Sequence, residues 1–253
     1  MSSIIEFIGP AGVGKSSIYK SLIRQNNKKS IFASIQEFYP KISKPQSGSL
    51  DNLILQARKI LRRPLYDAKK MRQAGYKFQS KNREFIELCW DLINKYQKTD
   101  HFGNDNRFTT ANNLFNYFSK FQAASDCRKP HLCLTDELLL HTIVQLTNEN
   151  YLNQEIIMFS ELVPLPLGII NCNAAPEVIA NRSLTRKTIH SQSGRTFQEL
   201  SIIAESERNK IDLMADTLKR RKVKVLKVDT TNSIELNTNI INDFIVNLTM
   251  EAS

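Results

Sequence analysis

The stretch that decides the fold is IIEFIGPAGVGKSSIYKSLI, residues 4–23. Its apolar start breaks into three glycines within six positions, and a helical pattern that opens with one lysine and two serines follows. Residues 9–16 fit the spacing G-x-x-x-x-G-K-[ST], and the buried strand before them and the helix after them complete the context of a phosphate-binding loop. An ordinary glycine-rich turn would explain neither the spacing nor this placement.

Each part of this loop has an expected chemical role. Glycines allow a tight turn in which successive amide N–H groups face inward and form a nest for phosphate oxygens. The following helix adds its positive N-terminal end. We expect Lys15 to reach the β- and γ-phosphates and the Ser16 hydroxyl to ligate Mg²⁺. The predicted nucleotide-binding residues are Gly9, Gly12, Val13, Gly14, Lys15, Ser16 and Ser17.

The pattern of the whole chain predicts an α/β fold. Five apolar runs rich in β-branched or aromatic residues alternate with helical patterns, which predicts a five-stranded parallel sheet with helices on both faces. The predicted strands cover residues 4–8, 30–35, 131–135, 167–172 and 223–228. The predicted helices cover residues 15–24, 50–61, 83–96, 111–125, 137–147, 176–186, 196–221 and 233–250.

The domain organisation follows from the long segment between the second and third predicted strands. That segment contains no convincing strand, so we interpret residues 49–125 as a helical insertion and residues 1–48 and 126–253 as the nucleotide-binding core. The insertion is strongly basic, because ten lysines and arginines between residues 58 and 83 face a single acid, Asp67.

Composition bounds the possible functions. The chain has 253 residues, of which 41% are hydrophobic and 24% are charged, as in ordinary globular proteins. No leader or continuous apolar span is visible, so we expect a cytoplasmic location. Four widely spaced cysteines without CxxC spacing suggest reduced core thiols. A net charge of +10 favours an anionic partner, which could be a nucleotide, a nucleic acid, an acidic glycan or a membrane surface.

Acidic residues follow the third predicted strand directly. Asp136 and Glu137 stand at the carboxyl end of HLCLT, where side chains in a parallel sheet face the ligand crevice. We expect Asp136 either to hold Mg²⁺ through its water shell or to accept the proton of an acceptor. Glu137 is the second candidate for either role, and it could instead begin the next helix.

Arginines follow the fourth predicted strand. In the helix that Pro176 opens, Arg182 and Arg186 are four residues apart and share one face. Guanidinium groups that close over a transferring phosphoryl group stabilise its charge. The polar stretch that ends in Gly194 and Arg195 completes what we predict to be a lid near residues 182–196.

Together, the loop GPAGVGKSS, the strand that ends in Asp136 and Glu137, and the strand followed by APEVIANRSLTRK resemble the P-loop kinases of the nucleoside monophosphate kinase group, in particular thymidylate kinases. The resemblance implies an ATP-dependent kinase that uses Mg²⁺, with Arg182, Arg186 and Arg195 as lid arginines. It also implies that Thr230, Thr231 and Asn232, in the stretch VKVLKVDTTNS, lie near the adenine. ATP is the expected nucleotide, because no Asn-Lys-x-Asp guanine signature is visible.

The acceptor is less defined. The Asp-Arg-Tyr and Glu-Arg-Ser trios that such kinases carry beside the acceptor are absent after the third strand. The basic insertion instead suggests an anionic small-molecule, nucleotide or glycan acceptor, with Arg62 and Arg63 as candidate contacts. Glu37 stands where related kinases place acceptor-contacting residues. The basic, partly amphipathic insertion could also rest on an anionic membrane, or be only a solvated surface.

Three function classes stay open. The first is a kinase that moves the γ-phosphate of ATP to an acceptor. The second is an ATPase or GTPase switch without an acceptor. The third is a nucleic-acid-directed kinase or ATPase, which the excess positive charge motivates. The oligomeric state is not indicated.

Overall fold

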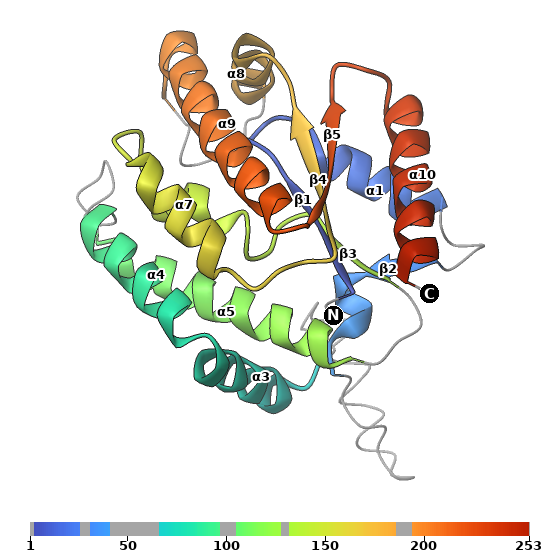
Figure 1. The fold of residues 1–253 in the computed structure, drawn as a ribbon. Helices are drawn as coiled ribbons and strands as arrows, with labels where there is room; N and C mark the ends of the chain where they lie inside the picture. Colours follow the sequence, from blue (N-terminus) through green and yellow to red (C-terminus); the bar gives the residue numbers. More distant parts are fainter. Residues whose placement is uncertain are drawn as a thin grey trace, which may run out of the picture.

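Five short strands form the centre of the computed structural model (Figure 1), which describes residues 3–25, 31–40, 66–96, 105–127, 132–185 and 194–252. The strands are β1 (Ile4–Ile8), β2 (Phe32–Ser34), β3 (Leu132–Thr135), β4 (Gly168–Asn173) and β5 (Lys224–Asp229). Their order across the sheet is β2-β3-β1-β4-β5, and every pairing is parallel. The predicted α/β class and five-stranded parallel sheet are confirmed.

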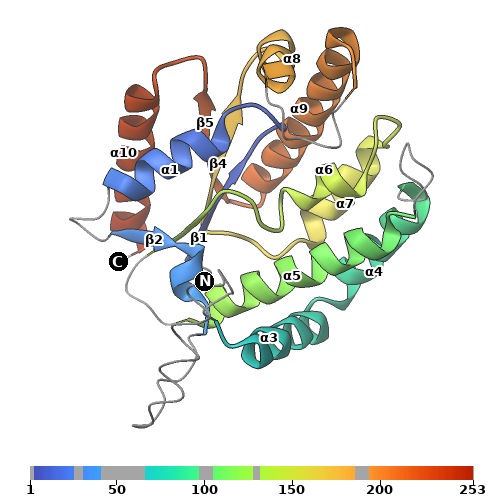
Figure 2. The same cartoon turned by 180° about the vertical axis from the view of Figure 1, so that it is seen from behind.

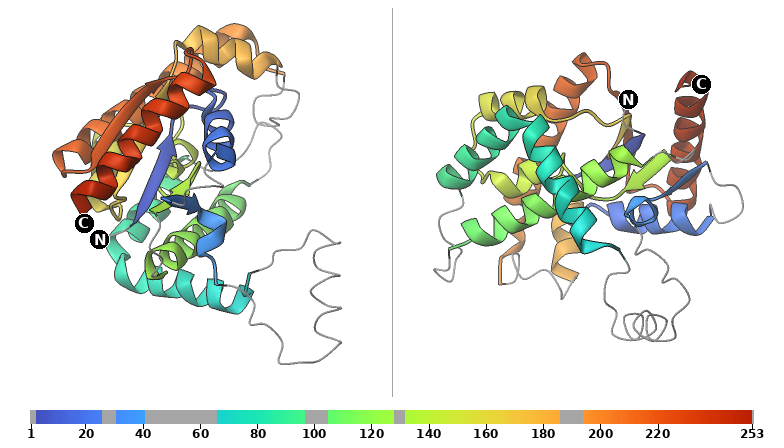
Figure 3. Two further views of the ribbon diagram at one scale, coloured as in Figure 1. Left: turned by 90° about the vertical axis from the view of Figure 1, so that its right-hand side faces the viewer. Right: turned by 90° about the horizontal axis from the view of Figure 1, so that it is seen from below.

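Alternation along the strands separates the two faces of the sheet. On one face, Ile4 and Ile8 join a core with Cys133 and with helices α4 (Arg83–Tyr96), α5 (Arg107–Asp126), α6 (Thr142–Leu146), α7 (Asn153–Leu162) and α9 (Phe197–Arg220). On the other face, Ile5 and Phe7 pack with helices α1 (Lys15–Gln25) and α10 (Ile234–Ala252). The view from below in Figure 3 shows α4, α5 and α7 on one side of the strands and α1 and α10 on the other. The phosphate loop therefore leaves a strand that is buried on both faces.

The helices that follow the strands are α1 (Lys15–Gln25), the 3₁₀ turn η2 (Ile35–Phe38), α6 (Thr142–Leu146), α7 (Asn153–Leu162), α8 (Pro176–Thr185), α9 (Phe197–Arg220) and α10 (Ile234–Ala252). Thr196 caps α9 and forms a capping box with Glu199, as the Thr-x-x-Glu spacing predicts. Among the described residues, no helix combines the length and the apolar character needed to cross a bilayer.

Helices α3 (Ala68–Lys81), α4 (Arg83–Tyr96) and α5 (Arg107–Asp126) lie between β2 and β3 in the chain and group together below the strands in Figure 2. Aromatic side chains bind them to each other: Phe78 stacks on Phe118 with ring centroids 4.6 Å apart, and Phe85 meets Phe159 of α7 at 5.2 Å. The insertion thus shares the hydrophobic core of the sheet. Its predicted role in acceptor binding stays a prediction.

Three helix predictions need correction. Helix α3 was not expected, because lysines and arginines are interspersed with its few apolar residues. Asp67 caps it by accepting hydrogen bonds from the N–H groups of Lys69 and Lys70. Helix α7 was missed as well. The helix expected at residues 137–147 begins only at Thr142, so Glu137 lies in the preceding loop and does not start a helix. The helix predicted at residues 50–61 lies outside the described residues.

Candidate functional site

The backbone of the phosphate loop explains its glycines. Gly9 and Gly12 have positive φ angles of 149° and 87°, which non-glycine residues rarely adopt. A side chain at Gly9 would also meet the Cys172 carbonyl oxygen at 2.5 Å, and one at Gly12 would meet Ser183 Oγ at 2.5 Å. The loop is therefore closely packed against β4 and α8 as well as sharply turned.

Unpaired amides make this loop an anion site. Within the described part of the chain, no acceptor is found for the backbone N–H groups of Gly12, Gly14, Lys15 and Ser16. The last two also form the N-terminal end of α1, whose dipole favours negative charge. Because unpaired N–H groups at a helix start bind phosphate readily, this geometry fits the tail of a triphosphate.

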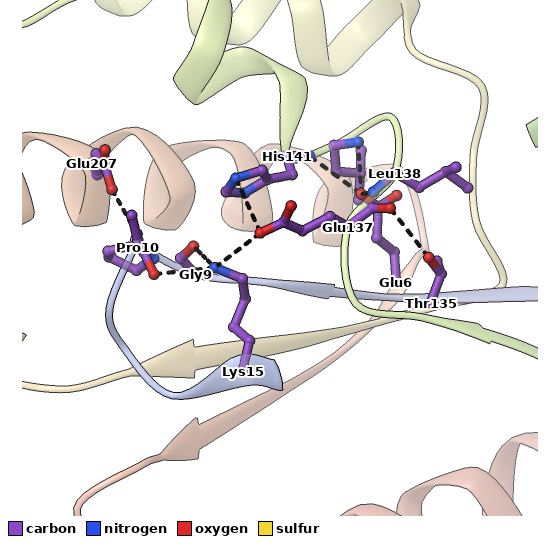
Figure 4. A network of polar contacts seen from close by, with 11 residues as sticks. Glu6, Gly9, Pro10, Lys15, Thr135, Glu137, Leu138, His141 and Glu207 are labelled. Atoms are coloured by element: carbon purple, nitrogen blue, oxygen red, sulfur yellow. Dashed lines mark hydrogen bonds and ion pairs between the residues drawn. The ribbon is translucent and has the colours of Figure 1, made fainter. Parts of the chain in front are cut away.

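Lys15 folds back over the loop (Figure 4). Its Nζ donates to the carbonyl oxygens of Gly9 at 2.6 Å and Pro10 at 3.1 Å, and it lies 4.0 Å from Glu137 Oε1. Burial lowers the pKa of Lys15 and raises the pKa of Glu137, while each charge partly offsets the shift of the other. A buried ammonium held only by two carbonyls and one distant carboxylate can turn to a phosphate.

The contact between Glu137 and His141 extends this cluster. His141 Nε2 lies 3.6 Å from Glu137 Oε1. Burial, and then the nearby Lys15 charge, lowers the pKa of His141 to about 3, so its imidazole is neutral near pH 7 and the contact is not an ion pair. Glu137 is thus the negative group that faces Lys15, with a neutral ring behind it.

A buried glutamate in β1 supports the loop after β3. Glu6 pairs in register with Thr135, the last residue of β3, and only 1% of its surface is exposed. One carboxylate oxygen accepts hydrogen bonds from the N–H groups of Leu138, Leu140 and His141 at 2.8, 3.0 and 3.2 Å. Burial raises the pKa of Glu6 to about 7 despite these bonds. Glu6 therefore fixes the loop that carries Asp136 and Glu137.

Asp136 stands free in the same loop. It is partly exposed, and the described residues offer it neither a hydrogen bond nor an ion pair. Its charge is close enough to influence the pKa values of Lys15 and Tyr19. Ser16 likewise has no hydrogen-bond partner among the described residues. A carboxylate and a hydroxyl that have no partner among the described residues suit Mg²⁺, which in nucleotide sites takes few protein ligands and several phosphate or water oxygens.

One side of the loop carries a hollow of about 270 Å³ lined by Gly12, Gly14, Ser17, Arg182, Thr230, Asn232 and Asn237, among others. Arg182 donates to Val13 O at 2.6 Å, to Thr230 Oγ1 at 3.0 Å and to Thr230 O at 2.9 Å. Thr230 Oγ1 itself donates to Val13 O at 2.6 Å. Of the predicted base-side residues, Thr230 thus contacts the loop and Asn232 lines the same hollow, while Thr231 is exposed and binds Asp229.

The other side of the loop carries a cavity of about 450 Å³ between residues 141–149 and α9. Ala11, His141, Arg195, Glu207 and Lys210 are among its lining residues. Glu207 Oε2 accepts a hydrogen bond from Ala11 N at 2.8 Å, so a carboxylate occupies one amide of the phosphate loop. Burial raises the pKa of Glu207, and the Ala11 hydrogen bond opposes that shift.

Of the remaining predicted residues, only Glu37 is described, and it does not lie at the loop. Glu37 lies in η2 and lines a separate hollow of about 660 Å³ with Lys70, Lys77 and Asp126. Part of the basic character of the insertion is neutralised there, because Lys77 pairs with Asp126 at 2.7 Å. Arg62, Arg63 and Arg186 lie outside the described residues, and their roles stay predictions.

Four residues near the loop were not singled out by sequence: Glu6, Glu207, Lys210 and Asn237. Glu6 had a visible signal, because an acid in the middle of the strand IIEFI has to find partners when both faces are buried. The other three lie on long helices with many similar polar residues, so only the fold distinguishes them.

No protein-family model matches the chain, and no curated protein matches it. Matches among solved structures include a deoxyadenosine kinase from M.mycoides with bound dATP. That protein is 10% identical, the match covers 96% of this chain and 98% of the other, and the TM-score is 0.43. At this identity and TM-score, function has to be argued from the geometry of the site itself.

Proposed function

We propose that this protein is an ATP-dependent phosphotransferase that moves the γ-phosphate of MgATP to the hydroxyl or phosphate of a small acceptor. The observation that carries the proposal is the group of four unpaired amides at the start of α1, beside a buried lysine that no carboxylate holds closely. Such a nest binds the charged tail of a nucleoside triphosphate.

Transfer to an acceptor, rather than to water, is favoured by the two hollows that flank the loop. The smaller one, lined by Arg182, Thr230 and Asn232, is our candidate for the nucleoside end of ATP. The larger one, which reaches Ala11, has room for a second small molecule beside the γ-phosphate. A switch protein needs only the first of these spaces.

The proposed reaction assigns roles to the residues of the loop after β3. The acceptor oxygen forms a bond to the γ-phosphorus, the bond between that phosphorus and the β,γ-bridging oxygen breaks, and ADP leaves with the electron pair. Glu137 receives the acceptor proton, since burial raises its pKa above that of an ordinary glutamate. Lys15 stabilises the charge that develops on the phosphoryl oxygens. When bound, Mg²⁺ would neutralise phosphate charge, held by Ser16 and by Asp136 through water.

The arginines complete the proposal. Arg182 braces the loop in the described conformation and so supports nucleotide binding. Arg195 lines the acceptor-side cavity, where it can approach the transferring group. Arg186 is a candidate of the same kind on sequence grounds alone.

Adenine is favoured over guanine by Asn237. Its Nδ2 donates to Asp229 O at 2.9 Å, which leaves Oδ1 as a buried acceptor without a partner among the described residues. Asn237 lines the smaller hollow. An amide oxygen pairs with the exocyclic amino group of adenine, whereas guanine presents an acceptor oxygen at the same ring position.

The test is transfer of label from γ-³²P-ATP to a fractionated pool of small metabolites in the presence of Mg²⁺. We expect a labelled product with the wild type, and a loss of about a hundredfold or more with Lys15→Ala. The matched control is Lys20→Ala, which removes an exposed lysine of the same helix. Release of free phosphate alone, at a rate that no acceptor pool changes, would favour the switch class.

A further inference from the structure

Lys210 is a buried lysine for which no ion pair is found among the described residues. It lies in the middle of α9, only 2% of its surface is exposed, and the described residues give it no hydrogen bond or ion pair. Its ammonium lies 4.8 Å from the centre of the Tyr151 ring. Buried lysines are almost always paired, because an uncompensated charge is costly to remove from water.

Lys210 lines the acceptor-side cavity together with other polar groups that lack partners. The buried atoms His141 Nδ1 and Ser206 Oγ have no hydrogen bond to a described residue, and both side chains line this cavity. Buried polar groups in folded proteins normally find partners. Both residues lie at the same cavity as Lys210.

The acids nearby do not replace such a partner. Glu207 is bound to Ala11 N, and Glu149 is exposed to solvent. Both influence the pKa of Lys210, which burial nevertheless lowers to about 8. The Lys210 ammonium therefore has no carboxylate of the described residues at contact distance.

The cavity has two unlike ends. Glu207, a hydrogen-bond acceptor, lies at the phosphate loop, and Lys210, a donor, lies three residues further along the same helix. Residues three apart are neighbours on a helix surface and are separated by about 5 Å along it. A molecule that satisfies both ends carries a hydroxyl on one side and an anionic group a short distance away.

We propose that the acceptor of this protein carries a carboxylate or phosphate group that binds Lys210, in addition to the hydroxyl that is phosphorylated beside Ala11 and Glu207. This inference rests on the proposed function and names its substrate class: small hydroxy acids and phosphorylated polyols. It moves the anion contact from the basic insertion to α9. Arg195, which lines the same cavity, adds a second positive charge on that side.

The experiment first fills the phosphate loop and then asks whether a second anion binds. The protein is saturated with Mg²⁺ and adenylyl-imidodiphosphate, whose γ-phosphate position is occupied, and this step is followed by calorimetry. Inorganic phosphate and acetate are then titrated separately. If adenylyl-imidodiphosphate does not bind, that result counts against the proposed function. The proposal for Lys210 is still tested in that case, because phosphate binding can be compared between the wild type and the Lys210 variants.

We expect at least one of the two anions to bind the loaded wild type, and its affinity to fall at least tenfold in Lys210→Met and in Lys210→Gln. Lys219→Met, which removes an exposed lysine of α9, keeps wild-type binding. The stronger anion identifies the acceptor group as phosphate or carboxylate.

A second readout covers the stability of the variants. We expect Lys210→Met to unfold at the same or a higher temperature than the wild type, because it removes a buried charge that lacks a partner. Absence of binding by both anions in the folded wild type, or equal binding in Lys210→Met, overturns the proposal. A strongly destabilised Lys210→Met and Lys210→Gln would show a structural lysine, which also overturns it.

Discussion

The two sides of the phosphate loop differ in how completely their polar groups are paired. On the nucleotide side, Arg182 and Thr230 each donate a hydrogen bond to Val13 O of the loop, and Arg182 also donates to Thr230 Oγ1 and Thr230 O. On the acceptor side, His141 Nδ1 and Ser206 Oγ have no hydrogen-bond partner among the described residues, and the buried Lys210 has no ion pair there. A paired side holds the loop in place, and an unpaired side indicates where a ligand completes the structure.

Glu6 holds the loop after β3. Its titration should have the largest effect, which is an effect on the free energy of unfolding. Its raised pKa means that the folded protein holds the proton more tightly than the unfolded chain, so this contribution to stability is complete below pH about 4.5 and is lost as pH rises through about 7. Over this window the wild type should lose up to about 3 kcal/mol relative to Glu6→Gln, which does not titrate.

Urea unfolding of both proteins at a series of pH values measures this difference, and contributions from His141 and other groups largely cancel. Glu205→Gln, at an exposed position of α9, is the control and should follow the wild type. A difference between wild type and Glu6→Gln that does not change with pH would show that Glu6 is not a buried titrating group.

The paired side can be broken at Arg182. Removal of the guanidinium leaves Val13 O and Thr230 O without its hydrogen bonds, so Arg182→Ala should weaken MgATP binding by about 2 kcal/mol, or roughly thirtyfold. Arg24→Ala, at the exposed end of α1, is the control for calorimetry. Unchanged ATP affinity with a large fall in turnover would instead assign Arg182 to the transferring phosphoryl group, as its place in the lid pattern predicts.

The hydrogen bond from Ala11 N to Glu207 is found on the acceptor side of the loop. Glu207→Gln removes a negative charge from the loop while keeping an oxygen near Ala11 N, so MgATP should bind tighter by about 1 kcal/mol, or roughly fivefold. Phosphate transfer should nevertheless become slower, because the acceptor hydroxyl loses a charged partner. Equal or weaker ATP binding than in Glu205→Gln would show that Glu207 does not compete with the triphosphate.

Asn237, whose buried Oδ1 has no hydrogen-bond partner among the described residues, gives the smallest expected effect. Asn237→Ala should reduce the preference for ATP over GTP by about 1 kcal/mol, or roughly fivefold, since one hydrogen bond to adenine is lost. The ratio of the two affinities is the readout, because general damage to the hollow affects both nucleotides. Asn239→Ala, exposed on the same helix, should leave the ratio unchanged, and a constant ratio in Asn237→Ala would exclude base recognition by this residue.

Sequence predicted the sheet and the phosphate loop well because both leave local signals. All five strands overlap the predicted apolar runs, and the glycine spacing of the loop matches its positive φ angles. Helices α3 and α7 were missed, since a basic or weakly patterned helix is stabilised by packing that sequence does not show. Sequence could not predict that Arg182 binds the phosphate loop or that Lys210 lines the cavity. Both depend on contacts between residues far apart in the chain, for which spacing gives no evidence.

The central claim is that the amides of Gly12, Gly14, Lys15 and Ser16 and the Lys15 ammonium bind the tail of a triphosphate. Calorimetric titration of the folded protein with MgATP tests it directly, with Lys15→Ala and Lys20→Ala measured beside the wild type. We predict saturable binding at one site, weakened about tenfold to a hundredfold by Lys15→Ala and unaffected by Lys20→Ala. Absence of binding to folded wild-type protein, or the same affinity in Lys15→Ala, would contradict the account.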